Sequence, residues 1–503
     1  MRRKPTILNV QLSFGLISIV LFVAFVSPFI YIQKAVDPAL VPRVFFLSIL
    51  TFVLHVFILY RIIFRKQLPC FTKTEIIALA LSFGYVLVSA ISSFFATNLF
   101  EALYETLKSF LFASFFLFLL VWLKPIEQNM KWIIKAVLFS ILILLLLAFF
   151  QFLRIDLSQI FSKENYLDYY YTREINLVSA TQANKNLFSS LLFLSLVFSF
   201  IGYIYLQKFW KTFCFAVGIG SLLFIGLLIT RAVWLSIVFS VFTALSILLL
   251  RLLVKKDFKL AQLFGIKKLI LYALILGLFL GGVVFLLTFK EGKVAEVLKS
   301  KVSGLIQNNY FDREKLMSTG QPNSAQTRLI TWYKTIDMFN QHPLTGIGPG
   351  NWQIMLPAQN LDAFEPDMRQ AKKYITRPHN DFLWVLSETG IFGFLFYFGL
   401  FVFAMVLALL LFINGADWRQ KWVGIIIVSG LSGFMLVSFV DFPKERVEHN
   451  LLINIAFAIV ILWYDSVSDN KSNKFNPKLY IHVSLLLTII SFFALLEIGR
   501  AHV

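Results

Sequence analysis

Predominantly apolar runs of roughly 18 residues or more recur along this chain of 503 residues, and each is long enough to cross the hydrocarbon core of a bilayer as a helix. In lipid every backbone N–H and C=O group must be paired within the spanning structure, which leaves only helices and closed barrels. The length of the runs favours helices. The sequence therefore predicts an all-α, polytopic integral membrane protein with about 12–14 transmembrane helices. The candidate spans lie near 12–32, 43–63, 76–96, 107–123, 132–153, 186–206, 211–230, 232–253, 268–289, 382–412, 421–441, 449–465 and 479–498.

The composition excludes other classes of protein. Hydrophobic residues make up 58% of the chain and charged residues 15%, more apolar side chains than a soluble core of this size could bury. The net charge of +19 does not indicate nucleic-acid binding, because the basic residues punctuate apolar runs as loop charges do. With two cysteines, Cys70 and Cys214, neither a disulfide framework nor a cysteine-based metal site is expected.

Lysine and arginine collect in alternate segments between the runs, which by the positive-inside rule predicts a cytoplasmic N-terminus. We interpret the first run as an uncleaved anchor, because it is long and no A-x-A site follows it. Residues 1–503 then form a single polytopic membrane domain. Its long external loop, 290–381, is predicted to cover the active site, and a smaller external loop spans 154–185.

Within the long loop, residues 324–341 are predicted to form an amphipathic helix on the mouth of the bundle. Pro343 ends the pattern. The apolar positions at helical spacing are Ala325, Leu329, Trp332, Ile336 and Phe339.

The segment HPLTGIGPGNW follows, with Gly346, Gly348 and Gly350. It does not lie between a strand and a helix, so dinucleotide-binding and P-loop readings are rejected. We interpret it as a tight turn whose backbone approaches another group closely.

Two arginines are candidate phosphate ligands. Arg231 separates two apolar runs in LLITRAVWLS; it is either an interfacial arginine at a hairpin tip or a ligand whose guanidinium fork matches a phosphate. Arg328 lies in the first turn of the predicted amphipathic helix, where a cation opposes the helix dipole unless both face a shared anion. The alternative is a solvated face residue.

His379 lies in TRPHNDFLW at the start of a span, flanked by Arg377, Asn380 and Asp381. An imidazole is suited to accept a proton from a hydroxyl nucleophile, although a structural or capping histidine is an alternative. Glu388 falls inside the same apolar span, where a carboxylate is either functional or paired with an arginine of a neighbouring span.

Signatures of metal chemistry are missing from the sequence, which has no H-E-x-x-H, C-x-x-C or D-x-D. We therefore expect a site that uses no metal and no cofactor.

Taken together, these motifs resemble the O-antigen ligase and polymerase superfamily of bacterial envelope enzymes. The resemblance is strongest over about 180–450 and is specific to the superfamily rather than to one member. It rests on ATQANKNLFSSLL (180–192), LLITRAVWLS (227–236), AQTRLITWYKTIDMFNQHPLTGIGPGNW (325–352), RPHNDFLWVLSETGIFG (377–393) and VDFPKERVEHNLL (440–452).

The resemblance implies a metal-independent, inverting glycosyltransferase of the all-helical membrane class. Such an enzyme takes a glycan from undecaprenyl diphosphate on the periplasmic face of the bacterial inner membrane. Arg231 and Arg328 look like its diphosphate-binding arginines, and His379 looks like the residue that activates the acceptor hydroxyl. Further substrate contacts are expected from Asn184, Lys185, Asn186, Arg377, Asn380 and Glu388.

The acceptor is left open by the sequence. The leading hypothesis is a ligase acting on lipid A-core, and its nearest rivals are a polymerase that extends the carrier-linked glycan and a protein O-oligosaccharyltransferase. A transporter of lipid-linked sugar is more remote, because no repeated halves are visible in the sequence. A scaffold would explain neither the His379 cluster nor the long loop. The run 479–498 is one span more than the twelve usual for a ligase.

Overall fold

The computed structural model describes residues 8–30, 32, 37–153, 178–182, 184–254, 324–359, 364, 374–468 and 477–500. In this part of the chain eleven helices are long and apolar enough to cross a membrane. The prediction of an all-α, polytopic membrane protein is confirmed. The span expected near 268–289, residues 154–177 of the smaller loop and residues 290–323 of the long loop lie outside the described residues. The eleven helices are α3 (Leu40–Arg65), α4 (Lys73–Ser93), α5 (Leu99–Trp122), α6 (Ile126–Leu153), α8 (Lys185–Tyr205), α9 (Phe209–Leu228), α10 (Arg231–Val254), α18 (Asp381–Asn414), α19 (Trp418–Val440), α20 (Val447–Val467) and α21 (Pro477–Arg500).

Shorter elements complete the described chain. The first apolar run forms α1 (Leu8–Leu21), a π-helical turn (Phe22–Val26) and α2 (Ser27–Phe29). The helix predicted over 324–341 is confirmed as α15 (Ser324–Gln341). Its buried face differs from the predicted one, because Ile330 and Met338 are buried whereas Ile336 is 37% exposed. The helix is followed by α16 (Trp352–Met355) and two 3₁₀ turns, Leu356–Ala358 and Pro443–Glu445.

The chain divides into two compact units. The first consists of Met1–Ala244, Lys334–Gln359 and Ile375–Val503 and holds the spanning helices except the end of α10. The second consists of Leu245–Tyr333 and Asn360–Tyr374, so the first part of α15 belongs to it.

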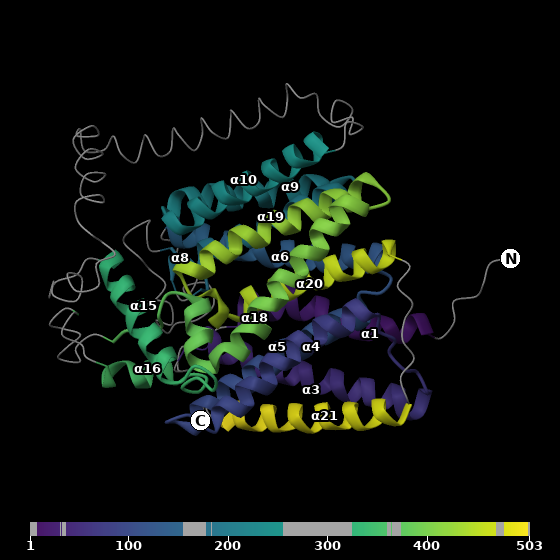
Figure 1. Cartoon of the computed structure of the whole chain (residues 1–503). Coiled ribbons are helices and arrows are strands. Elements are labelled where there is room, and N and C mark those ends of the chain that lie inside the picture. Colours follow the sequence, from purple (N-terminus) through teal and green to yellow (C-terminus); the bar gives the residue numbers. More distant parts are fainter. Residues whose placement is uncertain are drawn as a thin grey trace, which may run out of the picture. The chain divides into compact units, whose positions relative to one another are not determined.

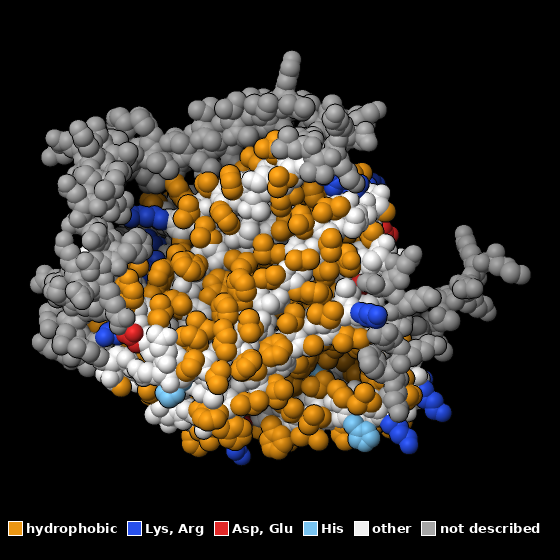
Figure 2. All heavy atoms as spheres, viewed as in Figure 1, with side chains coloured by type: hydrophobic (Ala, Val, Ile, Leu, Met, Phe, Trp, Pro, Cys, Tyr) orange, Lys and Arg blue, Asp and Glu red, His pale blue; other side chains and the backbone are white. Residues whose placement is uncertain are grey.

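Within the first unit the spanning helices pack side by side (Figure 1). Helix α20 is among the most deeply buried of them. It contacts α5, α6, α8 and α18, whereas α21 lies along α3 and exposes most of its surface. Figure 2 shows hydrophobic side chains spread over the visible face of the helices, with lysine and arginine mainly near its margins. A surface of this kind suits contact with lipid rather than water.

Polar residues fix where several spans begin. A side-chain oxygen just before the helix accepts a hydrogen bond from a backbone N–H of the first turn, and in α4 and α19 a capping box adds the reciprocal bond. The capping residues are Thr72, Asn98, Asn184, Asn380 and Asp417.

Helix α18 is broken at Gly390, where φ is +65°. The segment after α15 fills the break: the backbone N–H groups of Ile347 and Gly348 donate to the carbonyls of Ser387 and Glu388, each at 3.0 Å. The glycine-rich segment is thus a turn in close backbone contact, as the sequence predicted.

Alanine at Gly390 is expected to destabilise the fold. The new Cβ would lie 2.4 Å from the carbonyl oxygen of Leu344. The backbone at φ +65° and ψ −172° is a conformation that essentially only glycine adopts, and it costs another residue about 1–3 kcal/mol before any clash. We expect a lower midpoint of thermal unfolding in detergent. Gly226→Ala in α9 is the control, because its Cβ meets nothing within 4 Å; equal midpoints for the two variants would contradict the account.

Candidate active site

Several spans begin at one end of the first unit, which we call the His379 end. Ion pairs and hydrogen bonds tie their first residues together. Arg446 at the start of α20 pairs with Asp37 before α3 at 2.9 Å. Arg43 of α3 pairs with Glu448 of α20 and donates to the Thr181 carbonyl before α8 at 3.1 Å. Polar side chains from distant parts of the chain therefore gather at this end.

The centre of this cluster is formed by two short segments. The lip, residues 376–381, leads into α18, and the DFPKER turn, residues 441–446, joins α19 to α20. Alternate residues of the lip contact the turn: Arg377 bonds Glu445, His379 faces Asp441, and Asp381 accepts the backbone N–H of Lys444.

His379 is the residue of the lip best placed for proton transfer. Its Nδ1 lies 3.6 Å from Oδ1 of Asp441, its side chain is 34% exposed, and the edge of its ring meets Phe442. A carboxylate beside an imidazole stabilises the imidazolium that forms when the ring takes up a proton. The backbone φ of His379 is +55°, so this non-glycine residue holds a conformation that neighbouring contacts must maintain.

Arg377 is held by protein groups. Its Nε donates to Glu445 at 2.8 Å, its Nη2 bonds the same carboxylate, and its Nη1 donates to Gln353 at 2.9 Å. The guanidinium also stacks over Trp384. Burial alone would lower the pKa of Arg377, but Glu445 together with Glu105 and Glu388 outweighs burial and raises the pKa above its ordinary value.

Lys444 is a half-buried cation of the DFPKER turn, and its backbone N–H bonds Asp381 of the lip. Its ammonium group lies 4.1 Å from the centre of the Trp384 ring. Burial alone would lower its pKa, but acidic groups nearby raise the pKa above its ordinary value. Those groups belong to Tyr85, Glu388, Glu105 and Asp381.

Glu388 is buried in α18. Its Oε1 accepts the backbone N–H of Trp352 at 3.1 Å, and the indole Nε1 of Trp352 donates to Thr335 of α15 at 3.0 Å. The predicted carboxylate therefore connects the break in α18 to the segment that fills it.

The remaining predicted residues belong to other elements of the chain. Asn184 caps α8 by accepting the N–H of Leu187 at 3.0 Å, and Lys185 and Asn186 are half-buried in the first turn of that helix. Arg231 is the exposed first residue of α10. Arg328, half-buried in α15, belongs to the second unit.

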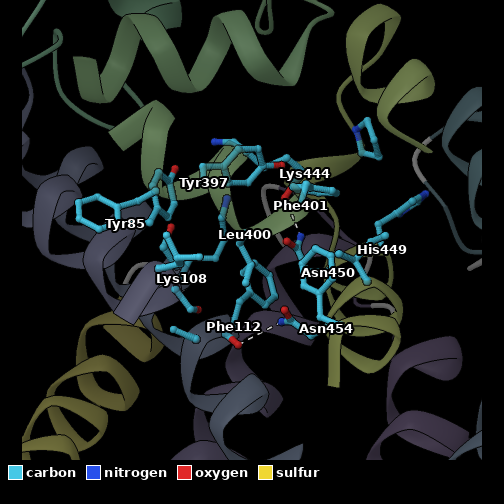
Figure 3. A pocket seen from close by; sticks show the side chains of 18 of the residues that line it. Tyr85, Lys108, Phe112, Tyr397, Leu400, Phe401, Lys444, His449, Asn450 and Asn454 are labelled. Atoms are coloured by element: carbon cyan, nitrogen blue, oxygen red, sulfur yellow. Dashed lines mark hydrogen bonds between the residues drawn. The ribbon is translucent and has the colours of Figure 1, made fainter. Parts of the chain in front are cut away.

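A cavity open to solvent lies between α4, α5, α18, α19 and α20. Figure 3 shows the side chains of Tyr85, Lys108, Tyr397 and Asn454 around it. Its polar part includes Glu105, Lys108, Lys444 and Glu445, and its apolar part includes Phe112, Phe401, Phe434 and Phe457. The cavity therefore offers charged groups beside an apolar interior.

Sequence reasoning did not single out Asp441, Lys444, Glu445 or Arg446. The stretch VDFPKERVEHNLL entered only as part of the resemblance. Its density of charge between two apolar runs was the signal that could have marked it.

The pair between Asp37 and Arg446 yields a prediction about pH. Burial would raise the pKa of Asp37, but Arg446 and the backbone N–H groups of Leu40 and Ala39 outweigh it, so the pKa lies below its ordinary value of 3.8. The stabilisation is therefore complete above pH 3.8 and is lost as pH falls through the lower, folded-state pKa. We expect Asp37→Asn to lower the free energy of unfolding by about 1 kcal/mol or less at pH 7. The difference in stability between variant and wild type should become smaller below pH 3.8. Thermal unfolding in detergent at several pH values measures this, with Glu497→Gln in an exposed pair as control. A stability difference that does not change with pH would contradict this role of the Asp37–Arg446 pair.

The fold and this cluster define a class: a polytopic, all-helical membrane protein with a histidine-containing polar site at one end of its bundle. Residues 216–398 match the family model described as O-antigen ligase. This match confirms the resemblance to the O-antigen ligase and polymerase superfamily, a group of glycosyltransferase-like enzymes. The matched stretch includes Arg231, Arg328 and the lip. No curated protein matches the chain.

Proposed function

We propose that this protein is a glycosyltransferase that moves a glycan from undecaprenyl diphosphate to a hydroxyl of lipid A-core. The observation that carries the proposal is the half-buried His379 beside Asp441, within a match to the O-antigen ligase family. We propose further that the protein resides in the bacterial inner membrane with its His379 end facing the periplasm, because lysine and arginine are denser in the segments expected at the opposite end.

The chemistry is a single displacement with inversion. His379 takes the proton of the acceptor hydroxyl as its oxygen attacks the anomeric carbon of the sugar. The bond from that carbon to the phosphate oxygen breaks, a glycosidic bond forms, and undecaprenyl diphosphate leaves with the electron pair. Asp441 stabilises the imidazolium that results.

Negative charge develops on the leaving diphosphate, and fixed cations that meet it lower the barrier. Arg231 and Arg328 are proposed for this role. The exposure of Arg231 is compatible with phosphate binding, and its guanidinium fork matches phosphate oxygens. The role of Arg328 rests on the family resemblance. Two arginines would thereby supply the charge for which other transferases use a metal ion.

The substrates are lipids, and the cavity beside the site suits such molecules because its charged part adjoins an apolar part. Asn184, Lys185, Asn186, Asn380 and Glu388 remain proposed contacts to the sugar or phosphates. A polymerase or a protein O-oligosaccharyltransferase would use the same donor half of the site, so these remain the alternative functions.

The test is transfer by purified, reconstituted protein without divalent metal. Undecaprenyl diphosphate-linked glycan is supplied with lipid A-core, with excess carrier-linked glycan, or with a peptide containing serine and threonine. Glycosylated lipid A-core is the expected product. Longer carrier-linked chains would make the protein a polymerase, and a glycopeptide would make it an O-oligosaccharyltransferase. Absence of transfer in all three would overturn the proposal.

A further inference from the structure

The bonding of Arg377 bears on its role. A guanidinium has five N–H donors. Nε and Nη2 each bond Glu445, and Nη1 bonds both Gln353 and the Thr376 carbonyl, so four donors are engaged. The side chains of Arg377 and Glu445 are 16% and 6% exposed. Little of this guanidinium remains to receive an anionic ligand.

Glu445 is itself fixed from its other side. Its Oε2 lies 3.4 Å from Nη2 of Arg446, whose Nη1 reaches Asp37 at 2.9 Å. Charges of alternating sign thus run from Asp37 through Arg446 and Glu445 to Arg377. The chain of ion pairs anchors the lip to the start of α20 and, beyond it, to the segment before α3.

We propose that Arg377 is a positioning residue, held by Glu445, that sets the place of His379 on the DFPKER turn. Arg377 and His379 are two residues apart in the lip, and their partners, Glu445 and Asp441, belong to the same turn. The left-handed backbone of His379 costs free energy, so contacts on either side must hold it. The anchor at Arg377 supplies one of them, and the bond from the Lys444 N–H to Asp381 supplies the other.

This inference rests on the proposed function and differs from the phosphate contact expected of Arg377 from the resemblance. The two roles predict opposite results for Glu445→Gln. If Arg377 bound the diphosphate, loss of the Glu445 charge would free the guanidinium group of Arg377 for the donor and lower KM for the donor. If Arg377 positions His379, the same change loosens the lip and lowers kcat.

Arg377→Lys and Glu445→Gln are therefore compared with wild type in the reconstituted transfer assay. A lysine keeps the charge but cannot make the paired bonds of the fork. We expect kcat to fall about tenfold or more in both variants while KM for the donor changes less than twofold, and we expect Glu445→Asp to recover part of kcat. The matched controls are Arg500→Lys and Glu497→Gln, which alter an exposed arginine–glutamate pair of α21 and should leave both constants unchanged.

Hydrogen–deuterium exchange of peptides covering 374–384 gives a readout that is independent of turnover. Faster exchange in these peptides than in wild type, with unchanged exchange in α20, is expected of Arg377→Lys. A lower KM in Glu445→Gln, an unchanged kcat in Arg377→Lys, or exchange equal to wild type would overturn the positioning role. Absence of transfer by wild type would refute the proposed function instead, while the exchange result would still decide whether Arg377 anchors the lip.

Discussion

Replacing His379 with alanine is expected to lower the rate of glycan transfer by about 10²–10⁴-fold, the contribution typical of a positioned general base. The attacking hydroxyl would then have to lose its proton without the imidazole that stands beside Asp441. Binding of the carrier-linked donor should persist, because the proposed phosphate ligands are arginines elsewhere in the chain. Turnover measured with saturating donor, together with donor binding to the same detergent-solubilised variant, tests both parts.

His482→Ala provides the matched control, since this exposed histidine of α21 bonds a backbone carbonyl within its own helix. It should leave transfer unchanged. Loss of donor binding in His379→Ala would make His379 a ligand of the donor. Turnover close to wild type would remove it from the chemistry altogether.

Arg231→Ala is expected to remove roughly 2–4 kcal/mol of transition-state stabilisation, as deletion of one charge-stabilising donor does in other enzymes. That corresponds to a loss of about 30–1,000-fold in kcat/KM. The physical reason is the charge that builds on the departing diphosphate. A guanidinium that is already in place stabilises that charge without a further rearrangement of protein or solvent. Single-turnover transfer rates compared with wild type measure the effect.

Arg251→Ala changes an arginine in the last turn of the same helix and should retain wild-type rates. This comparison separates loss of a particular cation from loss of positive charge on α10. If Arg231→Ala transferred glycan at nearly the wild-type rate, the diphosphate would have to be bound by other groups.

The spans and α15 could be predicted from the sequence because their signals are local. Leu329, Trp332 and Ile336 repeat at helical spacing, and Pro343 follows the helix end. The glycines at 346, 348 and 350 likewise predicted a close backbone approach, although not that the carbonyls of Ser387 and Glu388 would be its target.

The partners within the site could not be predicted in this way. His379 and Asp441 lie far apart in the sequence and meet because α18 and α19 pack against each other along their length. Nothing around Arg377 in the sequence indicates Glu445 as its partner. The positive φ of His379 is also unexpected for a non-glycine residue. Long-range packing decides these contacts, whereas hydrophobic pattern decides the helices.

The break in α18 has a consequence for how the protein is made. Carbonyl groups exposed by a broken helix are costly in lipid unless another group bonds them, and here the N–H groups of Ile347 and Gly348 do so. That segment is synthesised before α18. During biogenesis these hydrogen bonds can therefore form only after α18 has been synthesised and has entered the bilayer beside the turn.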